Sequence, residues 1–208
     1  MTLSLWSINV GKNVKFVIII INKVSSQEFI GLEKDRSDLM NVLDAIFTRR
    51  SIRKFTGEPI KDEDLKLILK AGFQAPSAHN YEPREYIVVR DREVLDKIAD
   101  FHQYAKMLPN AGCGIVVCGD TSKQEDMGFL VEDCSASIQN MLLAAHGLGL
   151  GAVWCGLYSR QHLVDAMSET LNLPGNIIPI GLVVVGVKEH DKDPKDRYNE
   201  EKIHYDKW

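Results

Sequence analysis

The stretch FLVEDCSASIQNMLLAAHGLGLGAVWC, residues 129–155, contains a long helical pattern, three glycines and a short apolar run in direct succession. Between Phe129 and Leu148 the apolar residues recur at helical spacing and cover much of the circumference. We therefore expect a long helix that is buried in the centre of the domain or against a partner subunit. The apolar run from Ala152 to Cys155 predicts a strand directly after it.

The glycines between these two elements decide which turn joins them. Gly147, Gly149 and Gly151 superficially resemble a dinucleotide-binding glycine loop, but such a loop follows a strand and opens a helix. Here the glycines close a helix and lead into a strand. The pattern favours a helix C-cap with a tight turn and excludes a Rossmann site.

The sequence on both sides alternates between helical and strand patterns. Helices are predicted at Leu39–Phe47 with Asp38 or Ser37 as N-cap, at Asp62–Phe73 ending before Pro76, at Glu93–Phe101 and at Gln161–Leu171. Strands are predicted at Tyr86–Val89, Gly114–Cys118 and Ile177–Val187. Strands interleaved with helices indicate an α/β or α+β domain in which helices cover a sheet.

Residues 1–38 stand apart as an N-terminal extension of uncertain order, and residues 39–208 form the functional domain. The apolar run Phe16–Ile21 is flanked by lysines and is far shorter than the roughly 20 residues that span a bilayer. No small-residue cleavage site follows it, which argues against a signal peptide. We interpret the run as an extra strand or a poorly fitting extension.

The bulk composition bounds the class of protein. A chain of 208 residues with 45% hydrophobic and 26% charged residues suits one compact globular domain. The net charge of -4 argues against nucleic acid as a partner, and no membrane partner is expected. The four cysteines form no Cys-x-x-Cys pair, which favours reduced core thiols in a cytoplasmic protein and indicates neither disulfides nor a metal site: Cys113, Cys118, Cys134 and Cys155.

The densest cationic feature is Arg49-Arg50-Ser51-Ile52-Arg53, between a helix and an extended segment. Three guanidiniums and a hydroxyl can grip a phosphate, because arginine forks match its oxygens in bidentate fashion. On an extended backbone Arg49, Ser51 and Arg53 would project to one side, with Arg50 and Ile52 opposite. Such a cluster taken alone is more often a solvated surface face.

The segment Ala75-Pro76-Ser77-Ala78-His79-Asn80 is a polar loop between a helix and a strand. Its small residues allow a planar ligand to approach the backbone, and Asn80 offers a donor and an acceptor to a heterocycle edge. Taken alone it would be an ordinary turn.

Three motifs in order, RRSIRKF at 49–55, APSAHN at 75–80 and GLGLGAVW at 147–154, resemble the FMN-dependent nitroreductase family. The resemblance extends from about Met40 to Trp208. It implies an α+β fold with a central, mostly antiparallel sheet flanked by helices. It also implies an intertwined homodimer with two non-covalently bound FMN molecules at the subunit interface.

The resemblance also implies roles for particular residues. Those expected to bind the FMN phosphate are Arg49, Arg50, Ser51 and Arg197, and Arg53 matches the cation at the flavin N1 and O2 edge. The loop expected from the other subunit comprises Pro76, Ser77, Ala78, His79 and Asn80, and the backbone amides expected near N5 are those of Trp154, Cys155 and Gly156. One departure concerns the substrate entrance, where the family often has an aromatic residue and this chain has Arg84.

The implied activity is reduction of small electrophilic acceptors such as nitroaromatics or quinones, in a ping-pong cycle with NAD(P)H as transient donor. No protein nucleophile is needed, since the cofactor carries the hydride chemistry. Two alternatives remain: a flavin-binding protein for storage or sensing, and a specialised enzyme of the same fold such as a dehalogenase. Cys155 is expected to be an inert core thiol, and Trp154 a packing residue.

Overall fold

The computed structural model describes residues 4–9, 15–20 and 40–208, with side chains from Met40 onward. The chain divides into two units, Met1–Leu39 and Met40–Trp208. In the first unit β1 (Ser4–Asn9) pairs antiparallel with β2 (Lys15–Ile20), with Ser4 opposite Ile20. The predicted run Phe16–Ile21 thus forms a strand over most of its length.

The second unit contains a four-stranded sheet in the order β3 (Arg84–Val89), β4 (Cys113–Asp120), β6 (Ile177–Gly186) and β5 (Gly151–Gly156). Every neighbouring pair is antiparallel. The order leaves β5 at one edge of the sheet. The α+β fold with a central antiparallel sheet flanked by helices is confirmed.

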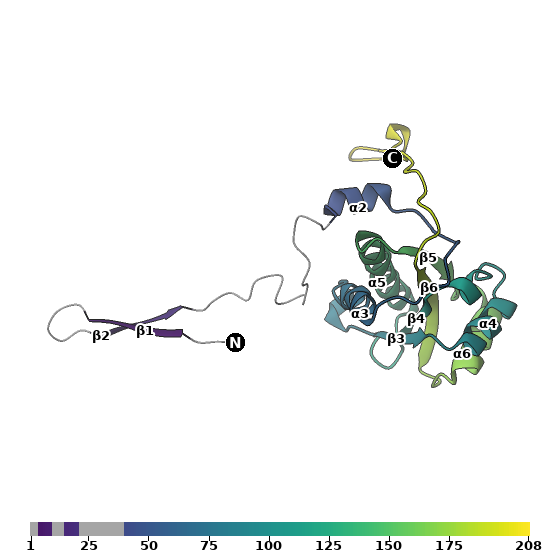
Figure 1. The fold of residues 1–208 in the computed structure, drawn as a ribbon, viewed down its shortest axis with the longest axis horizontal. Helices are drawn as coiled ribbons and strands as arrows, with labels where there is room; N and C mark the ends of the chain where they lie inside the picture. Colours follow the sequence, from purple (N-terminus) through teal and green to yellow (C-terminus); the bar gives the residue numbers. More distant parts are fainter. Residues whose placement is uncertain (1–3, 10–14, 21–39) are drawn as a thin grey trace. The chain divides into compact units, whose positions relative to one another are not determined.

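Helices cover both faces of this sheet (Figure 1). On one face lie α3 (Asp62–Phe73) and α5 (Met127–Gly147), and on the other lie α4 (Arg92–Phe101) and α6 (Gln161–Leu171). Successive residues of β4 alternate between the two layers: Ile115 and Val117 pack with the first pair of helices, Val116 and Cys118 with the second. Because both faces are buried, β4 is apolar without the usual polar alternation.

The predicted elements of this unit are all present, with ends that shift by a few residues. Helix α5 begins two residues before Phe129, because the Asp126 carboxylate caps it by accepting hydrogen bonds from the Gly128 and Phe129 amides. Residues Leu130, Cys134, Ile138, Met141 and Ala145 of α5 are all fully buried, as its sequence predicts.

The turn after α5 has the geometry of a Schellman motif. Gly149 has a φ of 83°, its amide donates to the His146 carbonyl, and the Leu150 amide donates to the Ala145 carbonyl. The glycine turn predicted from sequence is therefore a helix C-cap, and it leads directly into edge strand β5.

The first helix of this unit differs from its prediction. Helix α2 spans Val42–Thr48, and its N-cap is Asn41, whose side chain accepts a hydrogen bond from the Leu43 amide at 2.8 Å. The predicted caps Ser37 and Asp38, with Leu39, lie outside the described residues. Ala45 is the buried residue of α2, whereas its apolar residues Leu43, Ile46 and Phe47 are exposed.

The turn geometry predicts opposite effects for two glycine substitutions. Gly149→Ala places a Cβ at positive φ and should lower the free energy of unfolding by about 1 kcal/mol or more. Gly147→Ala lies in the last helical residue with no atom within 4 Å of the new Cβ, and should be neutral or stabilise by up to about 1 kcal/mol. Urea denaturation of both variants measures the difference, and equal effects would contradict the assigned turn.

Candidate functional site

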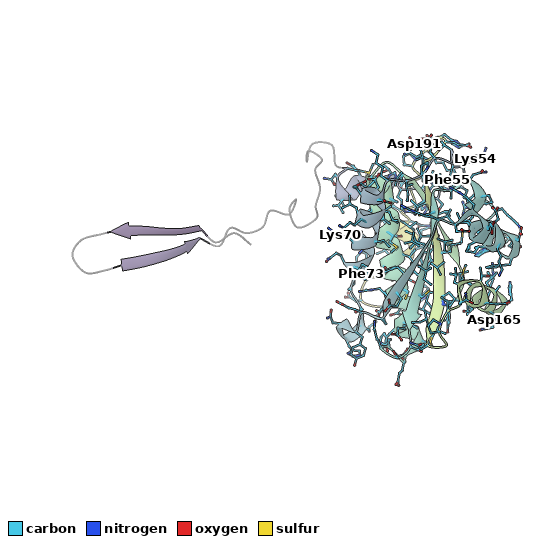
Figure 2. All side chains as sticks on the ribbon, turned by 60° about the horizontal axis from the view of Figure 1, so that its bottom comes forward. Lys54, Phe55, Lys70, Phe73, Asp165 and Asp191 are labelled. Carbon is cyan, nitrogen blue, oxygen red and sulfur yellow. The ribbon has the colours of Figure 1, made fainter. Side chains whose placement is uncertain are left out.

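The cationic segment after α2 is held in place by two buried side chains and the edge of the sheet. Ile52 and Phe55 lie in the core, and the Ile52 amide donates to the Ala152 carbonyl of β5 at 3.0 Å. Further along, the Thr56 amide donates to the Val187 carbonyl just after β6. Lys54, Phe55 and Asp191 consequently lie at the same end of the domain (Figure 2).

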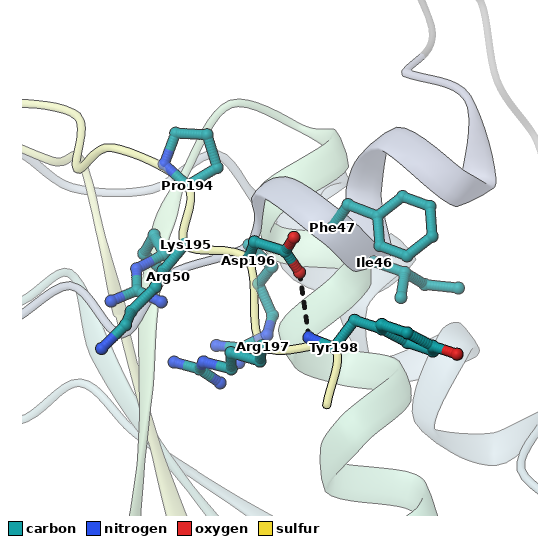
Figure 3. Close-up of a pocket in the computed structure, with 9 residues that line it drawn as sticks. Ile46, Phe47, Arg50, Pro194, Lys195, Asp196, Arg197 and Tyr198 are labelled. Carbon is teal, nitrogen blue, oxygen red and sulfur yellow. Dashed lines mark hydrogen bonds between the residues drawn. The ribbon is translucent and has the colours of Figure 1, made fainter. Parts of the chain in front are cut away.

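Four cationic side chains gather in one pocket where this segment meets the C-terminal tail. The pocket has a volume of about 530 Å³ and is formed by α2, the residues after it and the tail from Pro194 to Tyr198. In Figure 3 its polar side carries Arg50, Lys195 and Arg197, while Ile46, Phe47 and Tyr198 form the apolar side. The fourth cation is Arg49.

The four cations of this pocket share it with a single carboxylate, that of Asp196. Burial lowers the pKa of Arg49, and the positive charges of Arg197 and Arg50 lower it further. Among the described residues, none of the four cations forms an ion pair with a carboxylate. Asp196 also lines the pocket, but it accepts a hydrogen bond from the Tyr198 amide at 2.9 Å. The pocket therefore suits a ligand with more than one negative charge.

The buried Nε of Arg50 has no hydrogen-bond partner among the described residues. Arg50 also departs from the predicted alternation of side chains. It lines the same pocket as Arg49, whereas the prediction placed it on the opposite side of the backbone. Ile52 does lie opposite Arg53, buried where Arg53 is exposed. Ser51 is half-buried and pairs with Ala152, and it is not among the lining residues of this pocket.

Arg53 lines a second pocket of about 560 Å³, together with Tyr104 and Asn110. Its charge reaches the end of β5, because it counteracts the burial that raises the pKa of the Cys155 thiol. The segment from Arg49 to Arg53 thus connects a polyanion pocket with a separate cation next to the sheet edge.

The open edge of β5 offers backbone donors beside this cation. Since the Ala152 carbonyl faces Ile52, the strand alternation turns the amides of Trp154 and Gly156 to the same edge. Gly156 is exposed, and a Cβ added to it would meet no atom within 4 Å. Packing within the chain does not require a glycine there, so the position leaves room for a ligand to approach the backbone.

The side chain of Cys155 is buried and does not take part in the open edge of β5. Its Sγ donates to the Tyr104 carbonyl at 3.3 Å, and burial raises its pKa to about 11. The thiol is therefore protonated near neutral pH and a poor nucleophile, as predicted. Trp154 packs across Gly181 of β6, where a Cβ would lie 2.5 Å from its indole Nε1.

The loop from Ala75 to Asn80 adopts a strained conformation that several buried groups hold. His79, Asn80 and Glu82 all have φ between 48° and 56°. The buried Asp133 accepts a hydrogen bond from the Ala78 amide at 2.8 Å, and Ser77 Oγ accepts one from the Glu82 amide at 3.0 Å. Non-glycine residues at positive φ are costly and are often found at ligand-binding sites.

Arg84 has a different role from the one its sequence position suggested. Its side chain is buried and donates from one guanidinium nitrogen to the carbonyls of Ala75 and Pro76, at 2.9 and 2.8 Å. It fixes the base of the loop, whereas sequence reasoning left it at the substrate entrance.

The loop and the cationic pocket lie at opposite ends of α5 within one chain. Asp133 of α5 holds the loop, and His146 of α5 hydrogen-bonds Thr48, the residue before Arg49, at 2.8 Å. These two residues are thirteen positions apart, which corresponds to about 20 Å along a helix. The predicted site residues therefore form two separate groups in a single chain.

Sequence reasoning missed several residues of these groups. Lys195 stands two residues before Arg197 and shares its pocket, and the Lys195-Asp196-Arg197 pattern could have indicated it. Asp133 lies in the second turn of α5, and no sequence signal pairs it with Ala78. Nor does any pattern distinguish the buried His102.

Comparison with known proteins places the chain in a family. The family model for the Nitroreductase family matches residues 46–103 and 101–187 of this chain. The chain belongs to this family.

Individual relatives agree over nearly their whole lengths. A protein of Archaeoglobus fulgidus, provisionally named NADH dehydrogenase/NAD(P)H nitroreductase, is 45% identical over 170 residues, which cover 80% of this chain and 98% of the relative. A provisionally named NADH dehydrogenase/NAD(P)H nitroreductase of Parabacteroides distasonis has a similar solved structure, with 38% identity and a TM-score of 0.78 over 81% of this chain and 100% of the other. A provisionally identified nitroreductase of Desulfovibrio desulfuricans, solved in complex with FMN, is 31% identical with a TM-score of 0.71 over 81% and 98%.

Across the described residues, no helix combines the length and apolar character that a membrane crossing requires.

Proposed function

We propose that this chain is an FMN-dependent oxidoreductase that takes electrons from NAD(P)H and reduces small electrophilic acceptors such as nitroaromatics or quinones. The observation that carries the proposal is the pocket of four unpaired cations connected to Arg53 and the open β5 edge. Membership of the nitroreductase family and the FMN in the Desulfovibrio relative support it.

The residues fit this cofactor at both of its ends. Arg49, Arg50, Lys195 and Arg197 would hold the phosphate, which carries close to two negative charges and needs several donors. Ser51 would add its hydroxyl from the adjacent position. The buried, unpartnered Nε of Arg50 supplies a further donor at this end.

At the ring end, Arg53 would face the N1 and O2 edge, where a fixed cation favours the reduced, anionic flavin. The outward amides of Trp154 and Gly156 would donate to the ring edge near N5. By the same strand alternation the Cys155 amide faces β6 and not the open edge. Cys155 would therefore only connect Trp154 and Gly156 along the strand. Bound FMN supplies the hydride chemistry, with nicotinamide and acceptor using the same exposed face in turn.

We further propose that the complete site needs two copies of the chain. Pro76, Ser77, Ala78, His79 and Asn80 lie about 20 Å along α5 from the cationic pocket, so they would serve the flavin of a partner subunit. The exposed apolar residues support a wrapped homodimer: Leu43, Phe47, Phe73, Phe129, Ile203 and Trp208. Four buried free thiols are in keeping with a cytoplasmic location.

The overall function is tested by the absorbance spectrum of the purified protein during anaerobic reduction. We expect a yellow protein that bleaches with NADH or NADPH and regains its colour when a nitroaromatic or quinone is added. A flavin that both nicotinamides leave oxidised would instead indicate a storage or sensing protein.

The phosphate pocket is tested by replacing Arg49 with alanine. Loss of one charge-assisted contact should weaken FMN binding about 10- to 100-fold. Riboflavin lacks the phosphate, so its affinity should not change. The matched control is Arg90→Ala, which removes an arginine whose partner is Asp62 in an exposed ion pair. Isothermal titration measures all four affinities, and an equal loss of FMN and riboflavin binding would contradict the assignment.

The shared site is tested with mixed dimers of two defective chains. One chain carries Arg49→Ala, and the other carries glycine at positions 78, 79 and 80, which tolerates the positive φ at 79 and 80. In the mixed dimer one site has both intact parts and the other has neither, so half of the sites should bind FMN with wild-type affinity. If one chain supplied both parts, no site would regain that affinity.

A further inference from the structure

His102 is a fully buried polar residue that the proposed chemistry does not use. It follows the last residue of α4 and faces the end of β5, where its Nε2 lies 3.2 Å from the Gly156 carbonyl. Its Nδ1 lies 3.3 Å from the Tyr104 amide. Both ring nitrogens therefore have partners.

These two partners define the tautomer of the imidazole. A carbonyl can only accept, so Nε2 carries the proton and donates to Gly156. An amide can only donate, so Nδ1 is unprotonated and accepts from Tyr104. Burial lowers the pKa of His102 and outweighs the hydrogen bond to the Gly156 carbonyl, which raises it, so the neutral ring is favoured near pH 7.

Two further contacts connect the same pair of segments. Cys155 Sγ donates to the Tyr104 carbonyl at 3.3 Å, and the Arg160 guanidinium lies 4.9 Å from the centre of the Tyr104 ring. The segment around Tyr104 lines the pocket that holds Arg53. The end of β5 adjoins this segment through the Cys155–Tyr104 and His102–Gly156 contacts. His102 is fully buried and joins the Tyr104 segment to the Gly156 carbonyl.

His102 fixes the backbone at Gly156, which the local structure of the chain does not fix by itself. Gly156 is the last residue of an edge strand, and a glycine there has no Cβ to limit its backbone. Its carbonyl points away from β6, so its hydrogen bond comes from outside the sheet. A displacement there would move the backbone amides that face the open edge.

We propose that His102 is a positioning residue, which through its Nε2–H bond to the Gly156 carbonyl fixes the backbone donors of the β5 edge toward the ligand in the Arg53 pocket. The inference rests on the proposed function in taking that ligand to be the flavin ring. His102 does not touch the ring, and it neither gives nor takes a proton during turnover.

Two variants separate the two bonds of His102. His102→Gln places an amide nitrogen near the Nε2 position and keeps the donor to Gly156, while the bond to Tyr104 is lost. His102→Asn places its side-chain oxygen near the Nδ1 position and keeps the bond to Tyr104, while the donor to Gly156 is lost. Both variants remove the ring, so comparable losses of thermal stability are expected.

The flavin readouts should differ between these variants. In His102→Gln, the rate of flavin reduction by NAD(P)H should stay within about twofold of wild type. In His102→Asn this rate should fall about tenfold, because the variant loses one hydrogen bond that aligns the β5 amides. The midpoint potential of the bound flavin, measured by dye equilibration without nicotinamide, should change in the Asn variant by about 30 mV. This shift corresponds to a tenfold change in the equilibrium constant for two-electron reduction of the flavin.

Equal effects of the two variants on the potential, or no effect of either, would overturn the proposal and leave His102 a packing residue. A wild-type flavin that no nicotinamide reduces would contradict the proposed activity, while the potential would still test His102. If neither variant folds, ¹⁵N spectra of the wild-type histidine decide. We expect a protonated Nε2 and a bare Nδ1 near neutral pH, and the opposite tautomer would overturn the assignment.

Discussion

The fold brings four cations together in a pocket where, among the described residues, none of them forms an ion pair. Burial lowers the pKa of Arg49, and the charges of Arg197 and Arg50 lower it further, although Arg197 comes from the C-terminal tail and Arg50 from the segment after α2. Two like unit charges 4 Å apart repel by about 1 kcal/mol in water and by about 4 kcal/mol near a protein surface. The segment that carries Arg49 and Arg50 stays in place despite this repulsion because Ile52 and Phe55 are buried in the core. A bound dianion would attract all of these cations.

The second constraint is the length of α5. This helix separates the strained loop at its beginning from the cationic pocket at its end. In the proposed function each chain would therefore carry two partial sites. A flavin that used both parts would then lie between two chains, and the exposed apolar residues of each chain would be covered at the same time. Dimerisation and cofactor binding would then stabilise each other.

The sequence predicted the fold well where the pattern and the local chemistry agree. The periodicity between Phe129 and Leu148 gave a buried helix, and Gly149 gave its cap, because only a left-handed residue closes a Schellman turn. It left the packing of α2 open, where apolar residues at helical spacing form a helix whose Leu43, Ile46 and Phe47 are exposed in one chain. Periodicity identifies an apolar face but does not tell whether the chain itself or another copy covers it.

For the site, the sequence indicated the arginine cluster and the loop, because charge density and small residues are visible in the sequence itself. It could not locate groups that act through tertiary contacts. Arg84 is a buried clasp for the loop, and Asp133 and His102 find partners 55 and 54 residues away. None of these residues belongs to a pattern of its own, so only the folded chain reveals them.

The most direct measurement is a crystal structure of the protein grown with FMN. The account predicts a phosphate within hydrogen-bond distance of Arg49 and Arg197 of one chain, with the ring beside Arg53 and the β5 edge and covered by residues 76–80 of a second chain. A phosphate bound elsewhere, or a flavin whose contacts all come from a single chain, would contradict it.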